Sequence, residues 1–196
     1  MAPLRPPRAY TDDNASSGIW SANQVSGQSV YTPTLKLSSP KSGAYTTSVS
    51  LGAATTNLAA GTPVKFTLGM QSVTAPVVAD GVATGQLILS QKPALYTLTA
   101  TAAGVSASAP FTIDKDGTTL TAPRTASALT ATLKAAGSGA AVSGRKVQFL
   151  VNGKSVGTAT TSTTGVATLT YAAPSGSTVK AVFTGDAYFL GASATA

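Results

Sequence analysis

The chain has 196 residues, of which 43% are hydrophobic, only 6% are aromatic and 10% are charged, and its formal net charge is +7. It contains no cysteine, histidine or glutamate, which excludes disulfide staples, thiolate or imidazole metal sites and the usual catalytic bases. The 13 basic residues are scattered rather than clustered, which argues against a nucleic-acid footprint. No apolar run is long enough to span a membrane as a helix.

Residues 1–31 differ in composition from the rest of the chain. Three prolines fall within the first seven positions and a polar run follows. Because proline fixes φ and removes a hydrogen-bond donor, we expect an extended docking arm rather than a strand. No apolar run follows the charged start, so we expect no secretory signal. Arginine and aromatic side chains dominate interfaces, and they predict the docking residues Arg5, Arg8, Tyr10, Trp20 and Tyr31.

A competing interpretation exists for Trp20. Its ring can instead serve as an anchor that is buried against the first folded domain, without contacting any partner. The sequence alone does not separate these two roles.

From Thr34 onward, short runs of alternating apolar and polar residues predict β-strands. Seven strands at this spacing favour an immunoglobulin-like β-sandwich over residues 32–113. Tyr96 falls where a tyrosine corner is expected, in the sixth of these strands. The predicted strands are 34–38, 47–52, 63–68, 74–78, 81–89, 95–102 and 105–113.

The sequence then repeats itself. Val-Lys-Phe at 64–66 recurs as Val-Gln-Phe at 147–149, and Gly-Val-Ala-Thr at 81–84 recurs at 165–168. This internal repeat predicts a second sandwich over residues 118–196, joined to the first by a short hinge at 114–117. Its predicted strands are 118–122, 127–133, 146–151, 155–161, 165–171 and 178–183, with a short piece near Ala192.

The second unit resembles the bacterial immunoglobulin-like (Big-type) repeat domains. The resemblance is carried by four segments: Val147-Gln148-Phe149, Asn152-Gly153, Thr164 to Leu169, and Phe183 to Tyr188. The first unit departs from this pattern, since it has Ala-Gly-Val where the second has Gly-Asp-Ala-Tyr. The resemblance implies an all-β chain of two tandem immunoglobulin-like sandwiches, as found in surface proteins and tailed-phage virion proteins.

Aspartates are the only acidic residues that could act as catalytic or metal-binding groups. Five of the six stand beside glycine, asparagine or one another, where their oxygens cap local turns. Asp114 and Asp116 supply two carboxylates, too few for Ca²⁺, which takes six to eight oxygens, so a linker turn is favoured over the calcium alternative. We therefore predict no catalytic, cofactor-binding or metal site. The six are Asp12, Asp13, Asp80, Asp114, Asp116 and Asp186.

Together these features predict a non-enzymatic structural or interaction protein. The favoured interpretation is a tailed-phage virion protein, a capsid decoration or tail component, anchored by its N-terminal arm with the sandwiches projecting. Its partners would be other virion proteins, copies of itself and a host-surface glycan, with no nucleic acid and no membrane span. The alternative is a bacterial cell-surface or extracellular adhesin or spacer module that can bind glycans.

Overall fold

The structure, a computed structural model, describes residues 31–124 and 127–196. Within these ranges the chain forms β-strands joined by turns and loops, and no helix occurs. That part of the chain accordingly offers no helix of the length and hydropathy needed to cross a membrane. The predicted all-β class is confirmed, whereas the predicted arm lies outside the described residues except for Tyr31.

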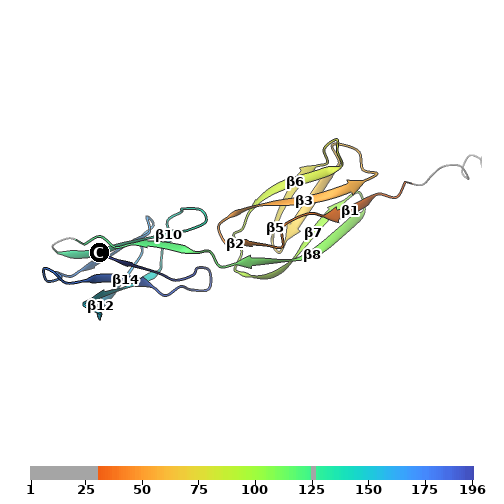
Figure 1. The fold of residues 1–196 in the computed structure, drawn as a ribbon. Coiled ribbons are helices and arrows are strands. Elements are labelled where there is room, and N and C mark those ends of the chain that lie inside the picture. The colour runs from red at the N-terminus through yellow and green to blue at the C-terminus, as the bar shows by residue number, and fades with distance from the viewer. Residues whose placement is uncertain (1–30, 125–126) are drawn as a thin grey trace, which may run out of the picture. The chain divides into compact units, whose positions relative to one another are not determined.

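The first β-sandwich is built from strands β1 to β8 in two sheets (Figure 1). One sheet has the order β1-β3-β6 and the other has the order β2-β8-β7-β4-β5. Neighbouring strands are antiparallel, except that β2 runs parallel to β8. The strands are β1 (Thr34–Leu37), β2 (Ser42–Ala44), β3 (Ser48–Thr56), β4 (Pro63–Leu68), β5 (Gln71–Pro76), β6 (Val82–Ile88), β7 (Ala94–Ala102) and β8 (Val105–Asp114).

The second β-sandwich is built from strands β9 to β15 and has the same plan (Figure 1). Its sheets have the orders β13-β10-β9 and β12-β11-β14-β15. Every strand pair within these two sheets is antiparallel. The strands are β9 (Thr118–Thr121), β10 (Ala128–Ala135), β11 (Lys146–Val151), β12 (Lys154–Thr160), β13 (Val166–Thr170), β14 (Val179–Phe183) and β15 (Ala192–Thr195).

Alternation along the strands sends one face of each sheet into a core. In β4, Val64, Phe66 and Leu68 are fully buried, whereas Lys65 between them is exposed. This period of two places successive side chains on opposite faces of a sheet. The first core joins residues from both sheets and consists mostly of valine, leucine and alanine, as the low aromatic content predicts.

The repeated segments occupy equivalent places in the two sandwiches. Phe66 in β4 lies opposite Ala100 in β7, and Phe149 in β11 lies opposite Ala181 in β14. Both phenylalanine side chains are fully buried. The predicted duplication is therefore a duplication of core positions.

Glycine opens both copies of the Gly-Val-Ala-Thr segment for a steric reason. Gly81 and Gly165 have φ values of +79° and +78°, in the left-handed region that favours glycine. A Cβ atom at Gly165 would lie 2.5 Å from the carbonyl oxygen of Leu133, and one at Gly81 would lie 2.8 Å from that of Thr55. Each glycine thus lets a turn approach the neighbouring strand closely.

Strand β2 is the main element that the sequence failed to predict. It is only three residues long, contains Gly43 and pairs with the end of β8. Among the described residues of the second sandwich no equivalent strand occurs, and only six positions, 122–127, separate β9 from β10, whereas Ser38–Thr47 separates β1 from β3. The two copies therefore differ mainly at this sheet edge.

The loop before β7 in the first sandwich and the loop before β14 in the second are stabilised by different side chains. In the first, the hydroxyl of Tyr96 donates a hydrogen bond of 2.7 Å to the carbonyl oxygen of Lys92, which confirms the predicted tyrosine corner. In the second, the guanidinium of Arg124 donates to the carbonyl oxygens of Ala173, Pro174 and Ser177. An arginine thus takes over the role of the missing tyrosine.

Candidate interaction site

Most of the predicted docking residues cannot be placed. Four of them lie outside the described residues: Arg5, Arg8, Tyr10 and Trp20. Both interpretations of Trp20 therefore stay predictions. Tyr31 is described, and 75% of its surface is exposed. The described residues instead bring together a group of side chains around the loop that follows β14.

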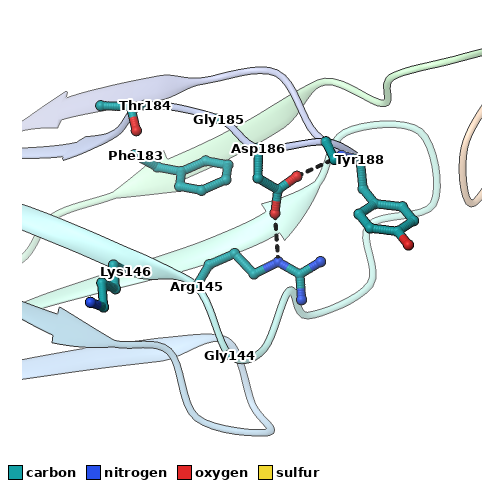
Figure 2. Close-up of a pocket in the computed structure, with 9 residues that line it drawn as sticks. Gly144, Arg145, Lys146, Phe183, Thr184, Gly185, Asp186 and Tyr188 are labelled. Atoms are coloured by element: carbon teal, nitrogen blue, oxygen red, sulfur yellow. Dashed lines mark hydrogen bonds and ion pairs between the residues drawn. The ribbon is translucent and has the colours of Figure 1, made fainter. Parts of the chain in front are cut away.

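A hollow of about 420 Å³ lies beside the start of β11 and the loop after β14 (Figure 2). Arg145, Lys146, Thr184, Asp186 and Tyr188 are among the residues that line it. In Figure 2 the side chain of Lys146 points away from the ion pair formed by its neighbour Arg145. The loop carries the Gly-Asp-Ala-Tyr segment on which the family resemblance depends.

Asp186 organises this loop. Its Oδ1 atom accepts hydrogen bonds from the backbone N–H groups of Tyr188 at 2.7 Å and Phe189 at 2.8 Å. Its Oδ2 atom accepts a hydrogen bond of 2.9 Å from Nε of Arg145 (Figure 2). The sequence-based assignment of Asp186 to a turn is confirmed, and the carboxylate also joins this turn to β11.

The same contacts set the acidity of Asp186. Partial burial by itself would raise the pKa of this carboxyl group, but the two backbone hydrogen bonds and the Arg145 guanidinium outweigh it. The net result is a pKa below the ordinary value. Asp186 therefore holds its charge at neutral pH and is unsuited to donate a proton there.

Arg145 is held from several sides. Besides the ion pair, its Nη1 atom donates to the carbonyl oxygen of Ser143 at 2.9 Å, and its guanidinium carbon lies 5.4 Å from the ring centre of Phe189. Nη2 has no hydrogen-bond acceptor among the described residues. The guanidinium of Arg145 is therefore held in place, and its Nη2 atom can donate a hydrogen bond to a ligand.

Tyr45, in the segment between β2 and β3, packs against the same loop. Its ring centre lies 5.1 Å from that of Tyr188 in a tilted arrangement and 5.4 Å from that of Phe189 in an edge-on arrangement. Both tyrosines are partly buried against the hydrophobic cluster that contains Phe189.

Asp116 lies in the linker between the two sandwiches and is buried, with only 2% of its surface exposed. Oδ2 accepts a hydrogen bond of 2.6 Å from the Thr46 hydroxyl, and Oδ1 accepts one of 3.1 Å from the Gly137 N–H. Its backbone N–H donates to the carbonyl oxygen of Tyr188, and its own carbonyl oxygen accepts from Leu190. The prediction that Asp116 caps a local turn is wrong, because its donors are distant in sequence.

These contacts define what we call the junction: Tyr45, Thr46, Asp116, Gly137 and Tyr188. In the described part of the chain, no three acidic residues lie close enough together to hold a metal ion. Both carboxylate oxygens of Asp116 are already hydrogen-bonded within the protein. The junction can therefore hold the linker and the two sandwiches together, whereas the Arg145 guanidinium in the hollow can bind an anionic group.

Comparison with known proteins gives structural similarities only. No family model matches the sequence, and no curated protein matches it either. Among solved structures, the chain is similar to the fibronectin(III)-like modules of CbhA from Clostridium thermocellum, with 19% identity and a TM-score of 0.30. That alignment covers 83% of this chain and 92% of the other.

Two further solved structures illustrate the same level of similarity. A 1.5-MDa bacterial ice-binding adhesin aligns with 17% identity and a TM-score of 0.36, over 83% of this chain and 62% of that one. Domains NIE-MG1 of alpha-2-macroglobulin from Escherichia coli align with 14% identity and a TM-score of 0.31, over 83% and 96% respectively. At these values the fold assignment rests on the chain's own sheets.

Proposed function

We propose that residues 33–196 act as a non-enzymatic spacer or adhesin module of an extracellular or cell-surface protein. The observation that carries this proposal is the junction, where a buried carboxylate joins the linker to both sandwiches. A module of this kind works by holding its domains at a set separation and orientation. A flexible linker would let both the separation and the orientation vary.

The hydrogen bonds of Asp116 supply the physical argument. Hydrogen bonds to charged groups contribute about 1.5–3 kcal/mol each, and a buried carboxylate deprived of its donors is penalised by desolvation. Separating Thr46 and Gly137 from Asp116 would therefore be unfavourable. The aromatic packing of Tyr45 on Tyr188 adds to the same contact.

The chemistry of the described residues also supports a non-enzymatic role. The sequence lacks histidine, cysteine and glutamate, three side chains that often serve as general base or nucleophile, and the one carboxyl group among the described residues with a resolved pKa shift, that of Asp186, is shifted downward. A general acid or base near neutral pH needs the opposite shift. The proposal thus assigns the chain a mechanical and binding role.

Fractionation of the producing cells tests where the protein works. Mass spectrometry of envelope, extracellular, cytosolic and purified virus-particle fractions would locate the chain. We expect enrichment in the envelope or extracellular fraction. Recovery from the cytosolic fraction alone would contradict the proposal, and recovery in virus particles would favour the virion interpretation.

The virion interpretation stays a prediction, because four of its five docking residues lie outside the described residues. If it holds, deletion of residues 1–30 abolishes incorporation into particles and leaves residues 33–196 folded. The matched control is the 196-residue chain with Lys65→Ala, an exposed change in the first sandwich that leaves the whole arm in place. Normal incorporation of the truncated chain would refute this interpretation.

A further inference from the structure

The second sandwich is unusually poor in acidic residues. Residues 118–196 include six basic residues and one acidic residue, Asp186, which gives this segment a net charge of +5. The acid is itself bound to Arg145, and this is the only ion pair among the described residues. The basic residues are Arg124, Lys134, Arg145, Lys146, Lys154 and Lys180.

Two of these lysines lie on the outer face of the sheet β12-β11-β14-β15. Lys146 in β11 is exposed and alternates with the buried Val147, and Lys180 in β14 is exposed and alternates with the buried Ala181. In the register of the sheet, Lys180 lies opposite Leu150, four residues along β11 from Lys146. At about 3.4 Å per residue and 4.8 Å between strands, the two lysines are about 14 Å apart.

The rest of this face consists of hydroxyl, amide and small apolar groups. Gln148 donates a hydrogen bond of 3.1 Å to the Ser155 hydroxyl, and Lys180 lies opposite Thr195 in β15. No acidic and no aromatic side chain belongs to the face. Its outward-facing residues are Lys146, Gln148, Leu150, Ser155, Thr158, Thr160, Lys180, Val182, Ser193 and Thr195.

The hollow continues this face at one end, since Lys146 belongs to both. Next to Lys146, the unused Nη2 atom of Arg145 and the Thr184 hydroxyl can bind an anionic oxygen and a neutral hydroxyl. Tyr188 adds an aromatic ring to the lining. A carboxylate, a hydroxyl and an apolar ring face are the groups that one acidic sugar unit presents.

We propose that this face and the hollow bind a carboxylated polysaccharide. Its carboxylates would pair with Lys146, Lys180 and Arg145, and its hydroxyls would bond the serine, threonine and glutamine side chains of the face. Single-stranded nucleic acid fits less well, because non-specific binding of bases uses a series of aromatic stacking platforms, whereas the face has none and the hollow has a single tyrosine, Tyr188. The glycan binding extends the proposed spacer role and does not depend on it.

The test is a binding titration of the full chain with polygalacturonate oligosaccharides at low ionic strength. The double variant Lys146→Gln/Lys180→Gln should weaken binding about tenfold or more, because it removes two charge-assisted contacts. The matched double variant Lys36→Gln/Lys65→Gln removes two exposed lysines of the first sandwich and should bind as the wild type does. Added salt should weaken binding to the wild type, since exposed charges are screened.

Parallel titrations with neutral dextran and with oligo(dT) complete the experiment. Weak binding of both, relative to polygalacturonate, supports the proposal. Equal losses in the two double variants would overturn it, because net charge alone would then explain the binding. Absence of polygalacturonate binding, or tighter binding of oligo(dT), would overturn it as well.

Discussion

At the scale of single residues, Asp186 shows how one carboxylate can serve a turn and a strand together. Its two oxygens satisfy two backbone N–H groups and one guanidinium, which links the loop after β14 to β11. The family-like Gly-Asp-Ala-Tyr segment therefore has a structural explanation in this chain. The segment shapes the loop that meets Tyr45.

Asp186→Asn tests the charge of this residue. Because the folded-state pKa is lowered from the ordinary 3.8, the carboxylate stabilises the fold above that value, and the contribution is lost as the pH falls through the folded-state pKa. We expect the variant to melt below the wild type at neutral pH and to approach it below about pH 4. Calorimetric melting across this range is the measurement.

Asp80→Asn is the control for the same titration. Asp80 is exposed, and its Oδ1 atom accepts one local hydrogen bond from the N–H of Val82. Its variant should melt close to the wild type throughout. If the melting temperature of Asp186→Asn stays below that of the wild type by the same amount in strong acid, the account is contradicted.

Gly165 offers a second test at this scale, because Gly153 provides a matched control. Both have φ of +78°, but a Cβ atom would clash with the Leu133 carbonyl oxygen only at Gly165, and nothing lies within 4 Å at Gly153. Gly153→Ala should lower the free energy of unfolding by about 1–2 kcal/mol, from backbone strain alone. Gly165→Ala should lower it clearly further, as measured by urea unfolding; equal losses would contradict the steric explanation.

At the scale of elements, the repeat makes the two cores comparable. Phe66 and Phe149 are each buried in a separate core of the described residues. Replacement of either by alanine should remove about 3–5 kcal/mol of stability, the range for a large buried aromatic residue. The loss should be confined to the sandwich that carries the change.

Hydrogen exchange read by mass spectrometry can locate that loss. Phe66→Ala should speed exchange in β1 to β8, and Phe149→Ala should speed exchange in β9 to β15. Lys65→Ala, at the exposed neighbour of Phe66, should change little. Exchange that rises equally in both sandwiches after either core change would show that they do not have independent cores.

The strands show which parts of the fold can be predicted from sequence. Alternating residues in β4 and β11 identify both core strands, because burial on one face imposes a period of two. Strand β2 was missed because three residues with a central glycine carry no such period. Its partner β8 is distant in sequence, so its pairing could not be predicted from local pattern.

The candidate site was predicted less well than the fold, for the same physical reason. Asp186 was assigned to a turn because it stands beside Gly185, and the structure confirms this because its backbone donors are two and three residues away. Asp116 was assigned to a local turn, yet its side chain binds Thr46, 70 positions away, and Gly137, 21 positions away. Contacts between repeats leave no periodic signal in either repeat.

At the scale of the whole molecule, the account depends on the junction. Asp116 contacts the first sandwich through its side chain and the second through both its side chain and its backbone. A spacer role requires that these contacts persist in solution. The central claim is therefore that Asp116 limits motion between the two sandwiches.

Double electron–electron resonance measures this motion directly. The chain has no native cysteine, so spin labels at Thr101→Cys and Thr168→Cys, both exposed positions on separate sandwiches, would be unique. We predict a narrow distance distribution for this labelled chain and for its Asp114→Ala control, and a clearly broader one after Asp116→Ala. A distribution that is broad from the start, or that Asp116→Ala leaves unchanged, would contradict the account.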